Sequence, residues 1–191
     1  MKSSLIALSL SLVAGTVFGA PTTFKIDPAH TYPSFEADHM GGMSVWRGKF
    51  RSSSGTVTLD AAAHTGDVDI TVDTASIDFG FDKMDTHAKS PDMFDVVKFP
   101  TATYKGKFTD FKGDAPAVAD GTLTLHGVSK PVQLIINSFK CQPNPMTKKL
   151  GCGADASAVI NRADFGIDFG KAYGFGMMVK LAIQVEAAKV D

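Results

Sequence analysis

The chain has 191 residues, 44% of them hydrophobic, and its 19 basic and 20 acidic residues leave a formal net charge of −1. This length fits one domain with an ample core. The balanced charge and the lack of a basic stripe argue against nucleic acid and acidic membrane surfaces as partners.

The N-terminus has the pattern of a secretory signal peptide. A positive charge precedes an apolar run from Leu5 to Phe18, which is too short to span a bilayer comfortably. Small residues place the cleavage after Gly19 or one residue later, after Ala20. We therefore expect residues 1–19 to be removed after export; an N-terminal membrane anchor or a buried strand is the alternative.

The remaining residues, 20–191, are expected to form a single domain made of short β-strands. Apolar and polar residues alternate in many segments, which is typical of half-buried strands. These segments cover residues 22–26, 32–40, 45–51, 56–60, 67–73, 101–108, 154–162 and 176–187, together with a hairpin over 120–139. Strands of this number and spacing predict an all-β barrel or sandwich.

Two stretches lack the alternation. Residues 82–95 are expected to form one or two short helices over an end of the sheet, and residues 112–120 a loop. Within the hairpin, Gly127 to Pro131 is expected to supply the turn. The arms of that hairpin share one strongly apolar face, which needs a partner surface or a ligand to cover it.

Cys141 and Cys152 are the two cysteines of the chain, and they flank a short loop. Because an exported chain meets oxidising conditions, we expect a disulfide between them. The alternative is a reactive or metal-binding thiol pair, which neither a Cys-x-x-Cys spacing nor a nearby histidine supports.

Alternation alone does not distinguish a barrel filled by its own side chains from a hollow one, and composition favours the filled barrel. A series of motifs runs in order along nearly the whole mature chain. It includes Asp27-Pro28-Ala29-His30-Thr31, Gly48-Lys49-Phe50, Asp85-x-His87-x-Lys89-Ser90, Gly121-x-Leu123-Thr124-Leu125-His126-Gly127-Val128 and Arg162-x-Asp164-Phe165-Gly166. This series resembles the YceI-like polyisoprenoid-binding family.

The resemblance implies a single antiparallel, eight-stranded, lipocalin-like barrel in the periplasm. Its apolar cavity would hold a polyisoprenoid or another long-chain amphiphilic lipid, and two subunits could pair as a homodimer. The implied protein is a carrier or store rather than an enzyme, and it needs no cofactor. Many family members carry an arginine where this chain has Met84, which indicates a preference for a neutral lipid.

The candidate ligand-binding residues lie on the apolar faces of the strands or at the expected mouth of the barrel. They are Phe35, His39, Trp46, Phe50, Ile70, Val72, Asp85, His87, Leu123, Leu125, Leu134, Ile136, Arg162 and Phe165.

The histidines do not fall at a familiar metal-ligand spacing, so we expect no metal site and assign each histidine to a hydrogen bond with backbone or a carboxylate. Arg162 is expected to pair with Asp164, or otherwise with a lipid headgroup. Two other functions stay open. One is an enzyme that uses Asp85 and His87 at the mouth, and the other is a stress-related interaction protein with a solid core.

Overall fold

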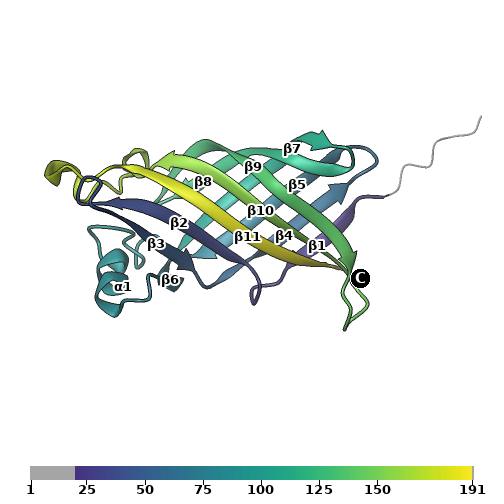
Figure 1. Cartoon of the computed structure of the whole chain (residues 1–191), viewed down its shortest axis with the longest axis horizontal. Coiled ribbons are helices and arrows are strands. Elements are labelled where there is room, and N and C mark those ends of the chain that lie inside the picture. Colours follow the sequence, from purple (N-terminus) through teal and green to yellow (C-terminus); the bar gives the residue numbers. More distant parts are fainter. Residues whose placement is uncertain (1–19, 191) are drawn as a thin grey trace, which may run out of the picture.

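The computed structural model describes residues 20–190, in which the strands form one antiparallel sheet (Figure 1). The expected signal peptide, residues 1–19, lies outside the described residues. The strands are β1 (Thr22–Ile26), β2 (Tyr32–His39), β3 (Ser44–Phe50), β4 (Ser53–Asp60), β5 (Thr65–Asp73), β6 (Ile77–Asp78), β7 (Thr101–Lys112), β8 (Ala115–Leu125), β9 (Val128–Pro143), β10 (Leu150–Asn161) and β11 (Met178–Lys189). The helices are α1 (Asp82–Lys89) and the 3-10 helices η1 (Thr74–Ser76), η2 (Arg162–Phe165) and η3 (Lys171–Tyr173).

The sheet closes into a barrel because β1 pairs with both β4 and β11. The closed ring runs β1-β4-β5-β7-β8-β9-β10-β11, which confirms the predicted eight-stranded antiparallel barrel. The three remaining strands, β2, β3 and β6, continue the wall toward the end that carries α1, at the left of Figure 1.

A break between β1 and β2 lets β11 pair with both strands at different heights. β11 pairs with β1 through Ala187–Lys189 and with β2 through Val179–Gln184. At the break, the Thr31 hydroxyl donates to the Glu186 carbonyl (3.1 Å) and accepts from the Glu186 N–H (3.2 Å). The Glu186 carbonyl also accepts the Asp27 N–H (2.9 Å), so the hydroxyl completes the hydrogen bonding of the Glu186 backbone at the break.

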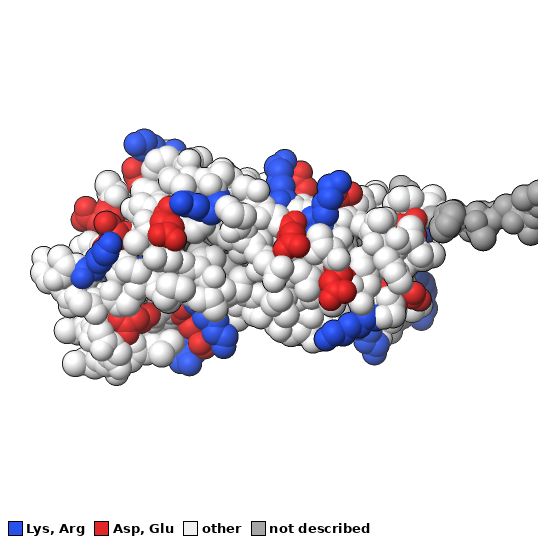
Figure 2. All heavy atoms as spheres, turned by 90° about the horizontal axis from the view of Figure 1, so that it is seen from above, with Lys and Arg blue, Asp and Glu red and all other residues white. Residues whose placement is uncertain are grey.

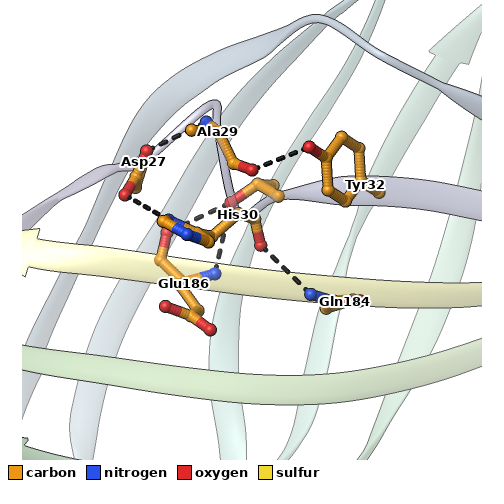
Figure 3. Close-up of polar contacts among 7 residues, drawn as sticks. Asp27, Ala29, His30, Tyr32, Gln184 and Glu186 are labelled. Atoms are coloured by element: carbon orange, nitrogen blue, oxygen red, sulfur yellow. Dashed lines mark hydrogen bonds and ion pairs between the residues drawn. The ribbon is translucent and has the colours of Figure 1, made fainter.

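The same break holds an ion pair on the surface. His30 Nδ1 lies 2.7 Å from the Asp27 carboxylate, which also accepts the Ala29 N–H (Figure 3). The hydrogen bond between the two side chains lowers the pKa of Asp27 and raises the pKa of His30.

The alternation on β5 shows how the sequence separates the two faces of the wall. Val68, Ile70 and Val72 point into the barrel. On the outer face, Asp69 and Asp67 form ion pairs with lysines of β7. Figure 2 shows acidic and basic side chains interspersed over one face of the molecule, without a large patch of one sign.

The barrel is plugged at the end opposite α1. Phe24 and Leu59 are buried there, and Phe108 and Phe139 pack against them. Next to this plug, Cys141 of β9 and Cys152 of β10 face each other and form the predicted disulfide, which is confirmed.

The short helix expected within residues 82–95 is confirmed as a single one, α1, because the chain forms turns after Lys89. Two other expectations about local structure need correction. The predicted loop over 112–120 is largely strand, since β8 begins at Ala115. The hairpin turn is His126-Gly127 alone, and both residues have positive φ (52° and 75°), as a tight two-residue turn requires. Within residues 20–190, no helix is long and apolar enough to cross a membrane.

We expect replacement of both Cys141 and Cys152 by alanine to lower the free energy of unfolding by about 3 kcal/mol, because the disulfide closes a loop of about a dozen residues in the unfolded chain. Denaturant unfolding of the variant measures this loss, and the chemically reduced native protein is its control. Equal stability of the oxidised and reduced native proteins would contradict the expectation.

We expect the stabilising effect of the Asp27–His30 pair to depend on pH. The raised pKa of His30 contributes stability that is complete below its ordinary value of 6.5 and is lost as pH rises through the folded-state pKa. The lowered pKa of Asp27 contributes stability above 3.8 that is lost as pH falls through its folded-state pKa. The stability difference between the native protein and His30→Ala should therefore be largest near pH 5 (a rough midpoint) and shrink on both sides. A difference that stays constant across pH-dependent unfolding experiments would refute this.

Candidate functional site

The barrel encloses a cavity of about 470 Å³, within the range of roughly 300–1,000 Å³ typical of small-molecule sites. Branched aliphatic side chains form most of its middle. Leu181, Ile183 and Val185 of β11 line it, and they are only half-buried because they face the hollow. The interior is therefore not filled by its own side chains, and the solid core that composition alone favoured is wrong.

The cavity approaches solvent at the α1 end. Phe169, in the connection between β10 and β11, lines the cavity and is still 39% exposed. Met84 and His87 of α1 also line it, so the helix covers this end only in part. His87 and Phe169 contact each other edge to face, with 4.6 Å between their ring centroids. We call this end the mouth of the barrel.

Two histidines bring polar atoms to the mouth. His39 ends β2, where its ring lies 4.9 Å from Trp46 and 5.7 Å from Phe175. Its Nδ1 is 3.4 Å from the Ser44 hydroxyl. His39 and His87 both line the cavity, so each ring has nitrogen atoms within reach of a polar group at the end of a ligand.

Asp38 holds two loops of the mouth together. Its carboxylate accepts the backbone N–H groups of Gly41 and Gly42 in the β2–β3 turn, and of Gly176 before β11. These hydrogen bonds, that of Gly176 above all, lower the pKa of Asp38. The carboxylate therefore stays ionised and acts as a clamp between the two loops.

Arg162 is a buried cation in the cavity wall. It donates to the carbonyl oxygens of Ile167 (2.9 Å) and Phe169 (2.8 Å). Burial lowers the pKa of Arg162, although an arginine keeps its charge at any physiological pH. The expected pairing with Asp164 is not what the structure shows, because the guanidinium faces inward and fixes the loop that follows η2.

Tyr104 places a hydroxyl within an otherwise apolar part of the wall. The hydroxyl lies 3.0 Å from the carbonyl oxygens of both Ala119 and Val132. Burial, with a smaller effect from Asp120, raises the pKa of Tyr104 to about 12. This hydroxyl is already engaged by the strands, so the middle of the cavity offers a ligand mainly apolar contacts.

The structure brings most of the candidate residues together around one space. Those that line the cavity are Phe35, His39, Trp46, Phe50, Ile70, Val72, His87, Leu123, Leu125, Leu134, Ile136 and Arg162. Asp85 does not line it and accepts the Phe79 N–H (2.7 Å). Phe165 does not line it either and is buried in the core around η2.

The candidate residues leave out further residues that line the cavity, some on strands and some on a helix or in loops. The inward row of β11 gave a clear signal, because its alternation was visible in the sequence. Met84, Phe169 and Phe175 gave none, since they lie on a helix and in a loop where no period of two marks the inward face. In the described part of the chain, no three histidine, cysteine, aspartate or glutamate side chains lie so as to hold a metal ion.

Comparison with known proteins agrees with this architecture. The YceI-like domain matches residues 24–187. Protein YceI of Salmonella arizonae and that of Salmonella paratyphi B are each 32% identical over 195 residues, covering 99% of this chain and 99% of each relative.

Solved structures share the fold at lower identity. BcnA of Burkholderia cenocepacia superposes with a TM-score of 0.68 at 20% identity, covering 85% of this chain and 99% of that one. A polyisoprenoid-binding domain from Saccharophagus degradans, implicated in plant cell wall breakdown, gives 0.61 at 15% identity, covering 88% and 99%. The domain match and the full-length relatives together show that the chain belongs to the YceI-like family.

Proposed function

We propose that the protein binds one long-chain lipid, a polyisoprenoid or a similar amphiphile, inside the barrel, and that it acts as a periplasmic carrier or store rather than as an enzyme. The observation that carries the proposal is an apolar cavity whose charged and histidine side chains, Asp38, His39, His87 and Arg162, lie at one end. An amphiphile has the same division between an apolar chain and a polar head.

The energetics favour a long chain. Each methylene that leaves water for an apolar wall gains roughly 0.8 kcal/mol. A chain of a dozen or more carbons thus gains on the order of 10 kcal/mol, enough to offset the cost of ordering it. Because this gain has no direction along the chain, the length of the cavity and the chemistry of the mouth set the selectivity.

The mouth favours a small, uncharged head group. Met84 provides an apolar thioether on the side of the mouth that α1 covers. The two charged side chains that line the cavity, Asp38 and Arg162, are engaged by backbone N–H and carbonyl groups, so neither is presented to a charged head. His39 and His87 can exchange hydrogen bonds with a hydroxyl or carbonyl group, so an alcohol or a ketone suits this end better than a phosphate.

Two further facts support a periplasmic carrier. The Cys141–Cys152 disulfide fits an oxidising compartment, as export by the N-terminal segment would provide. The structural relative from Saccharophagus degradans is described as polyisoprenoid-binding, and it shares the barrel.

We expect Ile183→Trp to weaken the binding of long chains, because the larger side chain takes up part of the cavity. Loss of about two methylene contacts, at roughly 0.8 kcal/mol each, corresponds to an affinity lowered about tenfold. Native mass spectrometry with prenyl alcohols of increasing length measures this loss, which should grow with the length of the chain.

Ala182→Trp is the matched control, since Ala182 is the next residue on β11 and is exposed on the outer face. Its affinity should equal that of the native protein. If the native protein takes up no prenyl alcohol, or if the inward and outward variants behave alike, the cavity is not the binding site.

A further inference from the structure

Large apolar side chains are exposed around the mouth of the barrel. We call these residues the apolar rim: Met40, Met43, Phe81, Phe169 and Tyr173. Met43 and Tyr173 are 74% and 79% exposed. Single exposed apolar residues are ordinary, but several on neighbouring loops at one end of a molecule mark an interaction surface.

The loops of the rim contact one another. A Cβ atom added to Gly41, in the turn between β2 and β3, would lie 3.1 Å from the Gly174 carbonyl oxygen. Phe169 contacts His87 of α1, and Phe81 immediately precedes that helix. The exposed side chains therefore belong to one surface at the end of the barrel rather than to separate loops.

Internal hydrogen bonds hold these loops in place. The Asp38 carboxylate joins the β2–β3 turn to Gly176 (2.7 Å), and Arg162 binds the carbonyl of Phe169. Met40 has a positive φ of 55°, an uncommon conformation for a residue other than glycine. These hydrogen bonds fix the backbone of the rim loops, whose apolar side chains are exposed to solvent.

The rim loops carry no net charge. Residues 40–44 contain no charged side chain, residues 79–83 contain Asp82 and Lys83, and residues 166–176 contain Asp168 and Lys171. In Figure 2 the outermost atoms at the left, where the mouth lies, are uncharged. A surface of this kind complements an apolar, electrically neutral partner rather than an acidic or basic one.

We propose that the apolar rim seats the mouth of the barrel on the surface of a zwitterionic lipid bilayer, from which the chain slides into the cavity. This inference rests on the proposed function. A chain that crossed water on its way would lose the stabilisation of every exposed methylene, whereas a docked mouth keeps the chain in apolar surroundings. Phe169 lies on that route, because it lines the cavity and belongs to the rim. Tyrosine and phenylalanine are side chains that enter the interface of a bilayer readily.

The test uses phosphatidylcholine vesicles and the double variant Met43→Ser/Tyr173→Ser. Both side chains are largely exposed, so the fold should not depend on them. We expect the native protein to float with the vesicles, and the double variant to bind them at least about tenfold more weakly, at low and high salt alike. Met146→Ser is the matched control, because Met146 is 85% exposed in the β9–β10 connection at the plugged end.

Uptake of a prenyl alcohol offered without vesicles separates docking from binding, and it should be the same in all three proteins. The docking proposal is overturned if the native protein does not float, or if the double variant and the Met146→Ser control bind vesicles equally. It is also overturned if light scattering shows that the rim residues instead hold two copies of the protein together. If the native protein takes up no prenyl alcohol, the proposed function itself is contradicted, whatever the result with vesicles.

Discussion

The pairing of β11 with two different strands is the constraint on which the rest of the structure depends. Its C-terminal part closes the eight-stranded ring against β1, while its N-terminal part pairs with β2 and carries the wall on to the mouth. A ring of eight strands leaves an interior just wide enough for its own side chains or for one small ligand. In this barrel the aliphatic rows leave a hollow between the phenylalanine plug at one end and α1 at the other.

The two ends of the cavity differ in the polar groups that they offer to a ligand. Toward the plugged end the wall is mainly aromatic, and the Thr31 hydroxyl there is engaged by the Glu186 backbone. In the middle, the Tyr104 hydroxyl is engaged by carbonyl groups. At the mouth, Asp38 and Arg162 are also engaged, but they order the loops that present His39 and His87. The charged residues thus order the entrance, and the rings of His39 and His87 are the polar groups placed to contact a ligand.

Much of this arrangement could be predicted from the sequence. In a strand with one solvent-exposed face and one buried face, polar and apolar residues alternate. The alternation on β5 and in the β8–β9 hairpin identified inward residues such as Ile70 and Leu134, which line the cavity. The resemblance to the YceI-like family supplied the closed barrel and its hollow interior, which periodicity alone does not reveal.

The rest depended on contacts between distant segments. Asp85 follows the family motif, yet its carboxylate turns away from the cavity to bind the Phe79 N–H. Arg162 reaches backbone carbonyls that follow it in a loop without any repeating pattern. The start of β8 at Ala115 was hidden by residues typical of turns, and pairing with β7 overrides that local preference. Tertiary contacts decide where the side chains of loops and helix ends lie. The residues in the wall of the site could therefore be predicted from the sequence better than those at its mouth.

The most direct measurement of the central claim is the identification of what the purified protein carries. Native mass spectrometry, followed by organic extraction and lipid analysis, should find one long-chain, weakly polar lipid per barrel, released when the protein is denatured. A protein that purifies without any lipid, and that leaves an offered long-chain alcohol in solution, would show that the hollow interior does not serve to bind a chain.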